Sequence, residues 1–295
     1  MTLAYLGLAA EPWAMTKHAL RELARSPDLA QKLPAENETA ARNKTLMPIA
    51  GPATRSLDGG SGRAVIVDGV ACIPIIGPIF PRDNFLTRYG YATSITGVQR
   101  DLFAALAADD VNACLLVIDS PGGAVSGVNG LADQLFAARS VKPLAAHATG
   151  TAASGAYWLG SQAERFTIER TGIVGSIGVV VCMPKQTEAD IDGNLWFDIV
   201  STNAPNKRPD PSTDDGMAEI VATLDALEGQ FIADVARGRA VTADKVTADF
   251  GRGGTKVGTD AQAASMVDGI SSIDAALARM ARVGKSFRKG QQAAR

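Results

Sequence analysis

Residues 149–166, TGTAASGAYWLGSQAERF, place a serine at the junction of two expected elements. A short apolar strand at 144–148 precedes this stretch, and a helix-compatible run that includes Tyr157 and Leu159 follows the serine. The small neighbours of Ser154 would let a substrate backbone approach, and the first amides of a helix have no intrahelical partner, so they can hold an oxyanion. Capping and close packing are the commoner reason for Ser-Gly-Ala at a helix start. A nucleophile is therefore indicated only together with the rest of the chain.

The same order of strand, turn and helix occurs one unit earlier. Residues 114–118 (CLLVI) form the continuous apolar run typical of a strand buried on both faces of a parallel sheet. Asp-Ser-Pro-Gly-Gly follows at 119–123; it suits a simple turn, but Gly122 and Gly123 can also point their backbone N–H groups outward as an anion-binding nest. This turn has no Gly-x-Gly-x-x-Gly and no Gly-Lys-Ser/Thr, so nucleotide binding is not expected. Ligands bind at the carboxyl ends of parallel strands, so these glycines and Ser154 could face one cleft.

The remaining core pattern alternates strands with helices, which predicts an α/β fold with right-handed crossovers. Residues 64–80 indicate two strands around Asp68-Gly69, a dipeptide suited to a hairpin turn. A helix is expected at 95–107, and further strands at 165–169 and 172–181.

A polar loop at 201–212 contains Lys207 and leads into a long amphipathic helix. Ser212 or Thr213 can cap this helix, and two aspartates suit its first turn. The apolar stripe of the helix comprises Met217, Ile220, Val221, Leu224, Leu227, Phe231, Ile232 and Val235.

Composition predicts a globular protein without a nucleic-acid partner. The chain has 295 residues, of which 46% are hydrophobic, and a formal net charge of −2, whereas general nucleic-acid binders carry excess Lys and Arg. No apolar run approaches the roughly 20 residues that span a bilayer, and the N-terminus lacks the basic region of a signal peptide. The three cysteines, Cys72, Cys114 and Cys182, lie in apolar stretches without metal-ligand spacing, so we expect buried thiols in a reducing compartment. These features predict a soluble cytoplasmic protein without cofactor or metal.

Both ends of the chain differ in composition from the middle. Residues 13–29 can form a short helix, and residues 30–62 are polar, rich in Pro and Gly and without periodicity. The predicted division is an N-terminal helix and flexible arm at 1–62, a core domain at 63–282 and a basic flexible tail at 283–295. The arm could be a docking segment or a self-cleaved one.

A serine hydroxyl needs a base to remove its proton, and the chain has few histidines to offer. His147 lies on the strand just before Ser154, where a packed imidazole is the expected role, and His18 lies outside the core. A lysine base is an alternative, which requires a desolvated amine. Spacing alone does not separate the candidates, which are Lys142, Lys185, Lys207 and Lys256.

Three motifs together resemble the S49 serine peptidase family, which contains the signal peptide peptidase A proteins and the phage head-maturation (capsid assembly) proteases. They are DSPGG at 119–123, ASGAY at 153–157 and GSIGV at 175–179. The resemblance covers roughly residues 64–280 and implies a ClpP/crotonase-like α/β fold with repeated ββα units and a mainly parallel sheet.

The resemblance also implies roles for individual residues. Ser154 matches the nucleophile, Lys207 the general base and Ser176 the serine that orients the lysine. The backbone N–H groups of Gly155 and of the Gly122-Gly123 turn would form the oxyanion hole. In half-length family members the serine and lysine come from neighbouring protomers, so a homo-oligomer is implied.

We therefore expect a Ser–Lys endopeptidase that acts on peptide or protein substrates, with scaffold or portal proteins of a phage capsid as implied partners. A signal-peptide-peptidase-like cytosolic protease is the alternative within the family. A crotonase-type acyl-CoA enzyme would need acidic groups in the cleft, where Asp119 is the obvious carboxylate, and would leave Ser154 without a purpose. An inactive assembly or scaffold component with the same fold is the third hypothesis.

Overall fold

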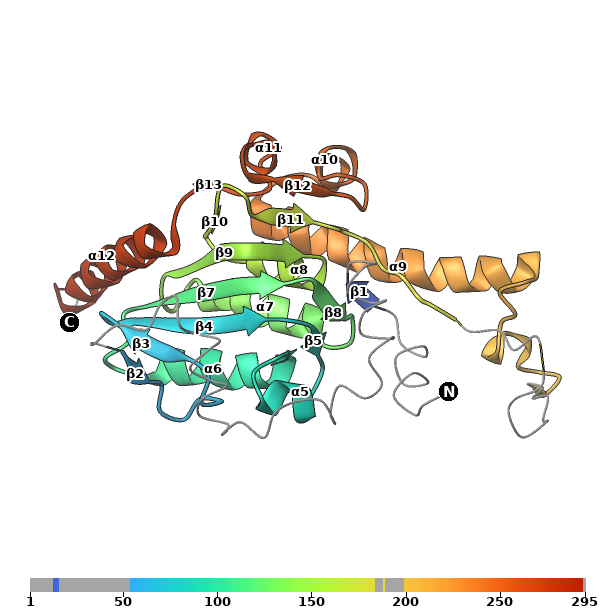
Figure 1. The fold of residues 1–295 in the computed structure, drawn as a ribbon, viewed down its shortest axis with the longest axis horizontal. Helices are drawn as coiled ribbons and strands as arrows, with labels where there is room; N and C mark the ends of the chain where they lie inside the picture. The colour runs from blue at the N-terminus through green and yellow to red at the C-terminus, as the bar shows by residue number, and fades with distance from the viewer. Residues whose placement is uncertain (1–12, 16–53, 184–187, 189–198, 294–295) are drawn as a thin grey trace.

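The computed structural model describes residues 13–15, 54–183, 188 and 199–293. Its centre is a mainly parallel sheet in a mixed α/β arrangement (Figure 1). Strands β4 (Val70–Ile76), β7 (Ala113–Ser120), β9 (Leu144–Ala153) and β11 (Ile173–Gly175) lie side by side in this order and run parallel. The sequence predicted a strand at each of these places, because apolar runs without alternation suit strands covered on both faces. However, β9 is longer than the predicted strand at 144–148, and β11 is shorter than the predicted strand at 172–181.

The edges of this sheet are antiparallel on both sides. Strands β2 (Arg55–Ser56) and β3 (Val65–Val67) extend it beyond β4, and β12 (Thr255–Val257) pairs with β11. Asp68 and Gly69 make the β3–β4 turn with φ of 51° and 78°, which confirms the predicted hairpin. Strand β10 (Arg165–Ile168) lies between two parallel partners, the first half of β9 and the short strand β13 (Gly269–Ile270).

A second, four-stranded sheet lies near the carboxyl end of the parallel strands, in the order β1-β8-β5-β6 (Figure 1). Its strands are β1 (Trp13–Met15), β5 (Ile79–Phe80), β6 (Thr93–Ser94) and β8 (Gly122–Ala124). Strand β8 contains both glycines of the Asp-Ser-Pro-Gly-Gly turn. The predicted turn therefore continues directly into a strand that has neighbours on both sides.

Helices cover both faces of the central sheet. Helices α6 (Ile95–Ala107), α7 (Val128–Ala138) and α8 (Gly155–Gly160) pack on one face and enclose the larger hydrophobic core. Helix α12 (Ile273–Ala293) covers the other face through Met280 and Leu277. The shorter helices are α5 (Phe85–Arg88), η1 (Pro205–Lys207), α10 (Ala243–Asp249) and α11 (Gly258–Ala263).

Helix α9 (Asp214–Arg239) is only partly packed against this body. The Thr213 hydroxyl caps the helix by accepting from the Gly216 amide at 3.1 Å, as predicted. Phe231 and Val235 are buried, whereas Met217 and Val221 in the first half are 45% and 42% exposed. The predicted apolar stripe therefore exists, but its first two turns contact little of the described chain.

Several expectations at the ends and among the cysteines were wrong. Residues 13–15 form a strand rather than the start of a helix; the rest of the predicted helix and Lys185 lie outside the described residues. Helix α12 continues to Ala293 through most of the expected tail, because Lys, Arg, Gln and Ala are all good helix formers. Cys72 and Cys114 are buried, which raises the pKa of each thiol to about 12, but Cys182 is exposed.

An ion pair joins the end of α9 to the segment before β13. Asp268 accepts from Arg239 at 2.7 and 3.0 Å and from the Phe166 amide at 2.6 Å. Burial alone would raise the pKa of Asp268, but these donors hold it below the usual value. Its contribution to stability is thus present above the unfolded-state pKa of about 3.9 and is lost as pH falls through the lower folded value.

We expect Asp268→Asn to lower the free energy of unfolding by about 2 kcal/mol at pH 7, because Arg239 would lose its carboxylate partner while 6% exposed. The deficit should shrink toward pH 3. Urea unfolding at both pH values measures it. Asp249→Asn is the matched control, since its pair with Lys245 is well exposed and should contribute less than about 0.5 kcal/mol. An equal effect of the two substitutions would contradict the prediction.

Candidate active site

Ser154 occupies the sharp turn between β9 and α8. Its φ of 55° and ψ of −123° lie in a region that non-glycine residues rarely adopt. Such a conformation costs on the order of 1–3 kcal/mol and persists only where the surroundings impose it. One such restraint is the Ser154 amide, which donates to the Gly175 carbonyl at 2.7 Å. The turn directs the serine out of the sheet at the carboxyl end of a central strand.

Helix α8 is held rigidly behind the serine, and all six of its residues are buried. The Tyr157 hydroxyl donates to the Met266 carbonyl at 2.9 Å. The Trp158 indole stacks on Phe231 of α9 with ring centroids 4.3 Å apart, and its N–H donates to Asp234 at 2.8 Å. Burial raises the pKa of Asp234 although the indole stabilises its carboxylate. These contacts fix α8 and therefore the position of Ser154.

The Ser154 hydroxyl is buried and has no hydrogen-bond partner among the described residues. A buried hydroxyl without a partner costs free energy, so it needs a reason other than stability. The same residue combines backbone strain with an unsatisfied polar atom. Both features cluster at functional sites.

Ser176 lies at the end of the neighbouring strand. In the parallel β9–β11 pair, Gly175 is opposite Ala153, so the residues that follow them leave the sheet side by side. Neighbouring strands are about 4.8 Å apart. Ser176 also has a positive φ of 54°, and its amide donates to the Gly254 carbonyl at 2.7 Å. The structure thus brings the backbones of Ser154 and Ser176 close together, as the family resemblance implied.

The glycines of β8 lie close to α8, which packs against this strand. Gly122 has a φ of 96°, and its amide donates to the buried Ser120 hydroxyl at 3.2 Å. Gly123 cannot carry a side chain, because a Cβ would lie 1.9 Å from the Ile79 carbonyl oxygen of β5. Gly155 is the first residue of α8, where the amide has no intrahelical acceptor. Sequence reasoning missed Ser120, whose hydroxyl accepts from the Gly122 amide, one of the three predicted glycine donors.

Lys207 is not brought to Ser154 within this chain. It lies exposed in the turn η1, where Asn206 donates to Glu219 of α9 at 3.1 Å. Glu219 precedes Phe231, which packs on α8, by 12 residues, a helix length of about 18 Å. The turn with Lys207 is therefore attached to the N-terminal half of α9, whereas helix α8, which follows Ser154, packs against the C-terminal half.

The two other candidate lysines that the structure describes, Lys142 and Lys256, do not replace it. The Lys142 amine donates to the Ala105 and Ala108 carbonyls at 2.9 and 2.7 Å, and burial lowers its pKa. It lies before β9, whereas Ser154 follows this strand of ten residues, about 33 Å long. Lys256 lies on β12, opposite Val174 of β11, and β12 is two strands away from β9.

His147 is a packed imidazole, as the sequence predicted. It is buried on β9 six residues before Ala153, about 20 Å along the strand. Its Nδ1 is 2.9 Å from the Thr167 hydroxyl, and its Nε2 lies 3.6 Å from Glu169, which accepts from the Ile273 amide at the start of α12. His147 therefore connects β10 and α12 rather than serving Ser154.

Stability should depend on pH through His147. Burial lowers its pKa, although Glu169 acts in the opposite direction. The contribution of neutral His147 to the free energy of unfolding is complete above the unfolded-state pKa of about 6.5. It declines as pH falls toward the lower pKa of the folded state. We expect the free energy of unfolding, measured with urea from pH 7.5 to 5, to decline less in His147→Gln than in the unaltered chain. Glu169→Gln should steepen the decline, and a shallower one would contradict this account.

Asp119 has a structural role that the sequence did not reveal. Its carboxylate accepts from the Thr151 amide at 2.9 Å, where a register shift interrupts the β7–β9 pairing between Ile118 and Ser120. Gly150 leaves room for it, since a Cβ there would lie 2.6 Å from the carboxylate. The Asp119 carboxylate therefore bonds to a backbone amide where the β7–β9 pairing is irregular. This structural role weakens the crotonase hypothesis, which needs Asp119 as a catalytic group.

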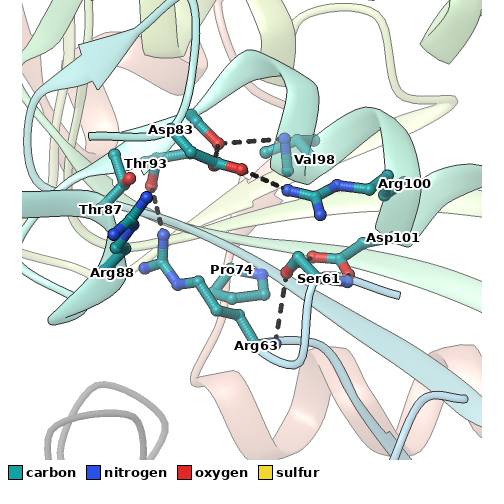
Figure 2. Close-up of a pocket in the computed structure, with 12 residues that line it drawn as sticks. Ser61, Arg63, Pro74, Asp83, Thr87, Arg88, Thr93, Val98, Arg100 and Asp101 are labelled. Atoms are coloured by element: carbon teal, nitrogen blue, oxygen red, sulfur yellow. Dashed lines mark hydrogen bonds and ion pairs between the residues drawn. The ribbon is translucent and has the colours of Figure 1, made fainter. Parts of the chain in front are cut away.

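A polar cavity of about 190 Å³ lies between β4, β6, α5 and the start of α6 (Figure 2). Asp83 accepts from Ser94 and, at 2.5 Å, from Arg100, while Asp101 accepts from the Ser61 amide and hydroxyl at 2.6 and 2.8 Å. Neither predicted serine nor any predicted oxyanion glycine lines this cavity. It is separate from the candidate catalytic groups.

Among the described residues, no helix is both long and apolar enough to cross a membrane.

The chain is similar in sequence to two phage proteins and to a bacterial protease. The chain is 28% identical to capsid assembly protease C of Escherichia phage lambda over 216 residues, which is 72% of this chain and 46% of that protein. It is 34% identical to the head-tail preconnector protein GP5 of Enterobacteria phage P21 over 116 residues, 39% of this chain and 23% of the relative. Protease 4 of Salmonella typhi is 28% identical over 185 residues, 59% of this chain and 29% of the relative.

The chain thus spans less than half the length of these relatives. The model of peptidase family S49 matches residues 137–286, which include Ser154, Ser176 and Lys207. This match covers half of the chain and includes two of the three motifs, those at 153–157 and 175–179. The chain belongs to peptidase family S49.

Proposed function

We propose that this chain is a serine endopeptidase with a Ser–Lys dyad on a ClpP/crotonase-like fold. The observation that carries the proposal is Ser154: a strained residue with an unpartnered hydroxyl at the carboxyl end of a parallel strand, next to a glycine strand and Ser176. Strain and an unsatisfied polar atom are costs that a merely structural serine would not retain.

In the proposed reaction the Ser154 hydroxyl attacks the scissile carbonyl while Lys207 takes its proton. The oxyanion would be held by the amides of Gly123 and Gly155, since the Gly122 amide already donates to Ser120. Collapse of the tetrahedral intermediate releases the amine, which receives the proton from Lys207, and leaves an acyl-Ser154. Water, deprotonated by the same lysine, then hydrolyses this ester. Ser176 would orient the lysine by a hydrogen bond.

The separation of Lys207 from Ser154 supports a site assembled from two copies of the chain. The exposed apolar residues on the first turns of α9, Met217 and Val221, offer a surface for a second copy next to the turn that carries Lys207. Docking of this end of α9 onto a neighbour would take the amine out of water, which favours its neutral, proton-accepting form. We therefore propose a homo-oligomer in which each Ser154 uses the Lys207 of an adjacent copy.

The proposed biological role is head maturation of a phage or prophage, with cleavage of scaffold or portal proteins in the host cytoplasm or the procapsid. Its support is the 72% of this chain that aligns with a phage capsid assembly protease. A cytosolic peptidase of the signal-peptide-peptidase type is the alternative, supported by the similarity to protease 4. An inactive assembly component would need no unsatisfied serine.

The test is cleavage of an unfolded protein by the purified chain, read by mass spectrometry of the products. Cleavage that is absent from the Ser154→Ala and Lys207→Ala variants but retained by Ser140→Ala supports the dyad. Ser140 is a suitable control because it is exposed and its hydroxyl donates to the local Ala137 carbonyl. Cleavage that survives Ser154→Ala would refute the proposal.

A further inference from the structure

The three residues of β1 pair with the strand that carries the proposed oxyanion donors. Strand β1 runs antiparallel to β8, with Ala14 opposite Gly123 and Met15 opposite Gly122. On its other side β8 pairs with β5, where Gly123 lies opposite Ile79. Both edges of β8 are therefore occupied, one by the core domain and the other by a segment from the N-terminal end of the chain (Figure 1).

A peptide substrate would need the edge that β1 occupies. An extended peptide binds a sheet edge through backbone hydrogen bonds, and the β5 side of β8 is closed by the core domain. A carbonyl held by the Gly123 amide must belong to a residue next to Gly123 across the ladder, which is where Ala14 lies. Strand β1 and a substrate strand cannot both occupy this position.

The buried state of Ser154 agrees with a closed site. The residue is completely inaccessible in the whole chain, although a nucleophile must meet a substrate carbonyl. Helix α8, which starts directly after Ser154, packs on β8. The strand that pairs with β8 is thus next to the turn that substrate has to reach.

We infer that residues 13–15 are an intramolecular pseudosubstrate, which occupies the substrate-strand position on β8 and holds the peptidase latent until another extended peptide displaces it. This inference rests on the proposed function, since latency has meaning only for an active enzyme. Three residue pairs are a weak ladder on their own. Because the segment belongs to the same chain, its effective concentration is of millimolar order, which suffices against weak substrates and fails against a strongly binding strand.

The experiment removes the backbone donors of β1 without altering the core domain. Ala14→Pro and Met15→Pro are made separately, because consecutive residues of an antiparallel pair alternate in their hydrogen bonding and one of the two must donate to β8. Ala14→Ser is the matched control, since it changes the same side chain but keeps the N–H. Each substitution is also combined with Ser154→Ala, which allows binding to be measured without cleavage.

The binding probe is a fluorescent peptide with the sequence of residues 10–18, AEPWAMTKH, followed by anisotropy in the Ser154→Ala background. We expect at least one proline variant to bind it about 10-fold or more tightly than the parent, with Ala14→Ser unchanged. In chains with Ser154 intact, the same proline variant should cleave an unfolded protein about 10-fold faster than the parent.

Equal peptide affinity in the parent and both proline variants would overturn the pseudosubstrate, whatever the cleavage rates are. Tighter peptide binding by a proline variant without cleavage by any chain would overturn the proposed peptidase, and latency with it, while the strand site on β8 would stand. Tighter binding with an unchanged cleavage rate would overturn latency alone.

Discussion

Replacement of Ser154 by alanine or glycine is expected to lower the rate of peptide cleavage by at least about 1,000-fold, because the proposed acyl intermediate forms on the serine hydroxyl. The two variants should differ in stability. Alanine keeps the Cβ in a backbone region that disfavours side chains, whereas glycine adopts the φ of 55° and ψ of −123° freely.

We therefore expect the free energy of unfolding of Ser154→Gly to be about 1 kcal/mol higher than that of Ser154→Ala, and equal to or above that of the unaltered chain. Elsewhere in a strand or helix the order is the reverse, since glycine is usually less stable than alanine. Urea unfolding of the three chains measures the order. A glycine variant less stable than the alanine variant would mean that the turn is not strained, and would remove one of the two observations behind the proposed nucleophile.

The positions of Ser154 and of the Gly122-Gly123 turn could be predicted because each follows an apolar run. Ser176 lay inside the predicted strand 172–181, whereas β11 ends at Gly175, so only the family resemblance indicated its place in the site. In a parallel sheet such runs end at one edge, so residues just after neighbouring strands meet. The register bears this out, with Gly175 opposite Ala153 and Ser120 opposite Ala152. Local pattern and topology agree at this edge of the sheet.

The location of Lys207 could not be predicted, because spacing along the chain says nothing about where a polar loop lies. The strand at 13–15 was equally hidden, since its partner is more than 100 residues away and three residues carry no periodicity. The tail was predicted wrongly because its charge suggested fraying, while its residues favour a helix that packs on the sheet through Leu277 and Met280.

A Lys207 supplied by an adjacent copy and a β8 edge occupied by residues 13–15 are compatible with each other. The proposed nucleophile and oxyanion donors lie on packed elements, with Trp158 stacked on Phe231 and Gly123 in close contact with Ile79. The proposed base, Lys207, and the proposed competing strand, residues 13–15, both belong to other segments of the chain. Assembly could thus regulate the enzyme, since oligomerisation would supply Lys207 and a substrate strand would displace residues 13–15.

Mixed oligomers should reveal whether Ser154 and Lys207 act across two copies. Each single variant, Ser154→Ala or Lys207→Ala, should lose at least about 1,000-fold in cleavage rate when expressed alone. Co-expressed in equal amounts, the two variants should regain about a quarter of the unaltered activity, because random assembly pairs an intact serine with an intact neighbouring lysine in that fraction of sites.

Two measurements make the mixing result decisive. Co-expression of Ser154→Ala with the unaltered chain is the matched control and should retain about half of the activity, since half of the serines remain. Native mass spectrometry of each preparation establishes that mixed assemblies have formed, because the two variants differ in mass. If co-expressed variants form mixed oligomers yet stay as inactive as either variant alone, then both residues serve the same copy. In that case the loop with Lys207 would have to fold back along the roughly 18 Å of α9 between Glu219 and Phe231 before each catalytic cycle.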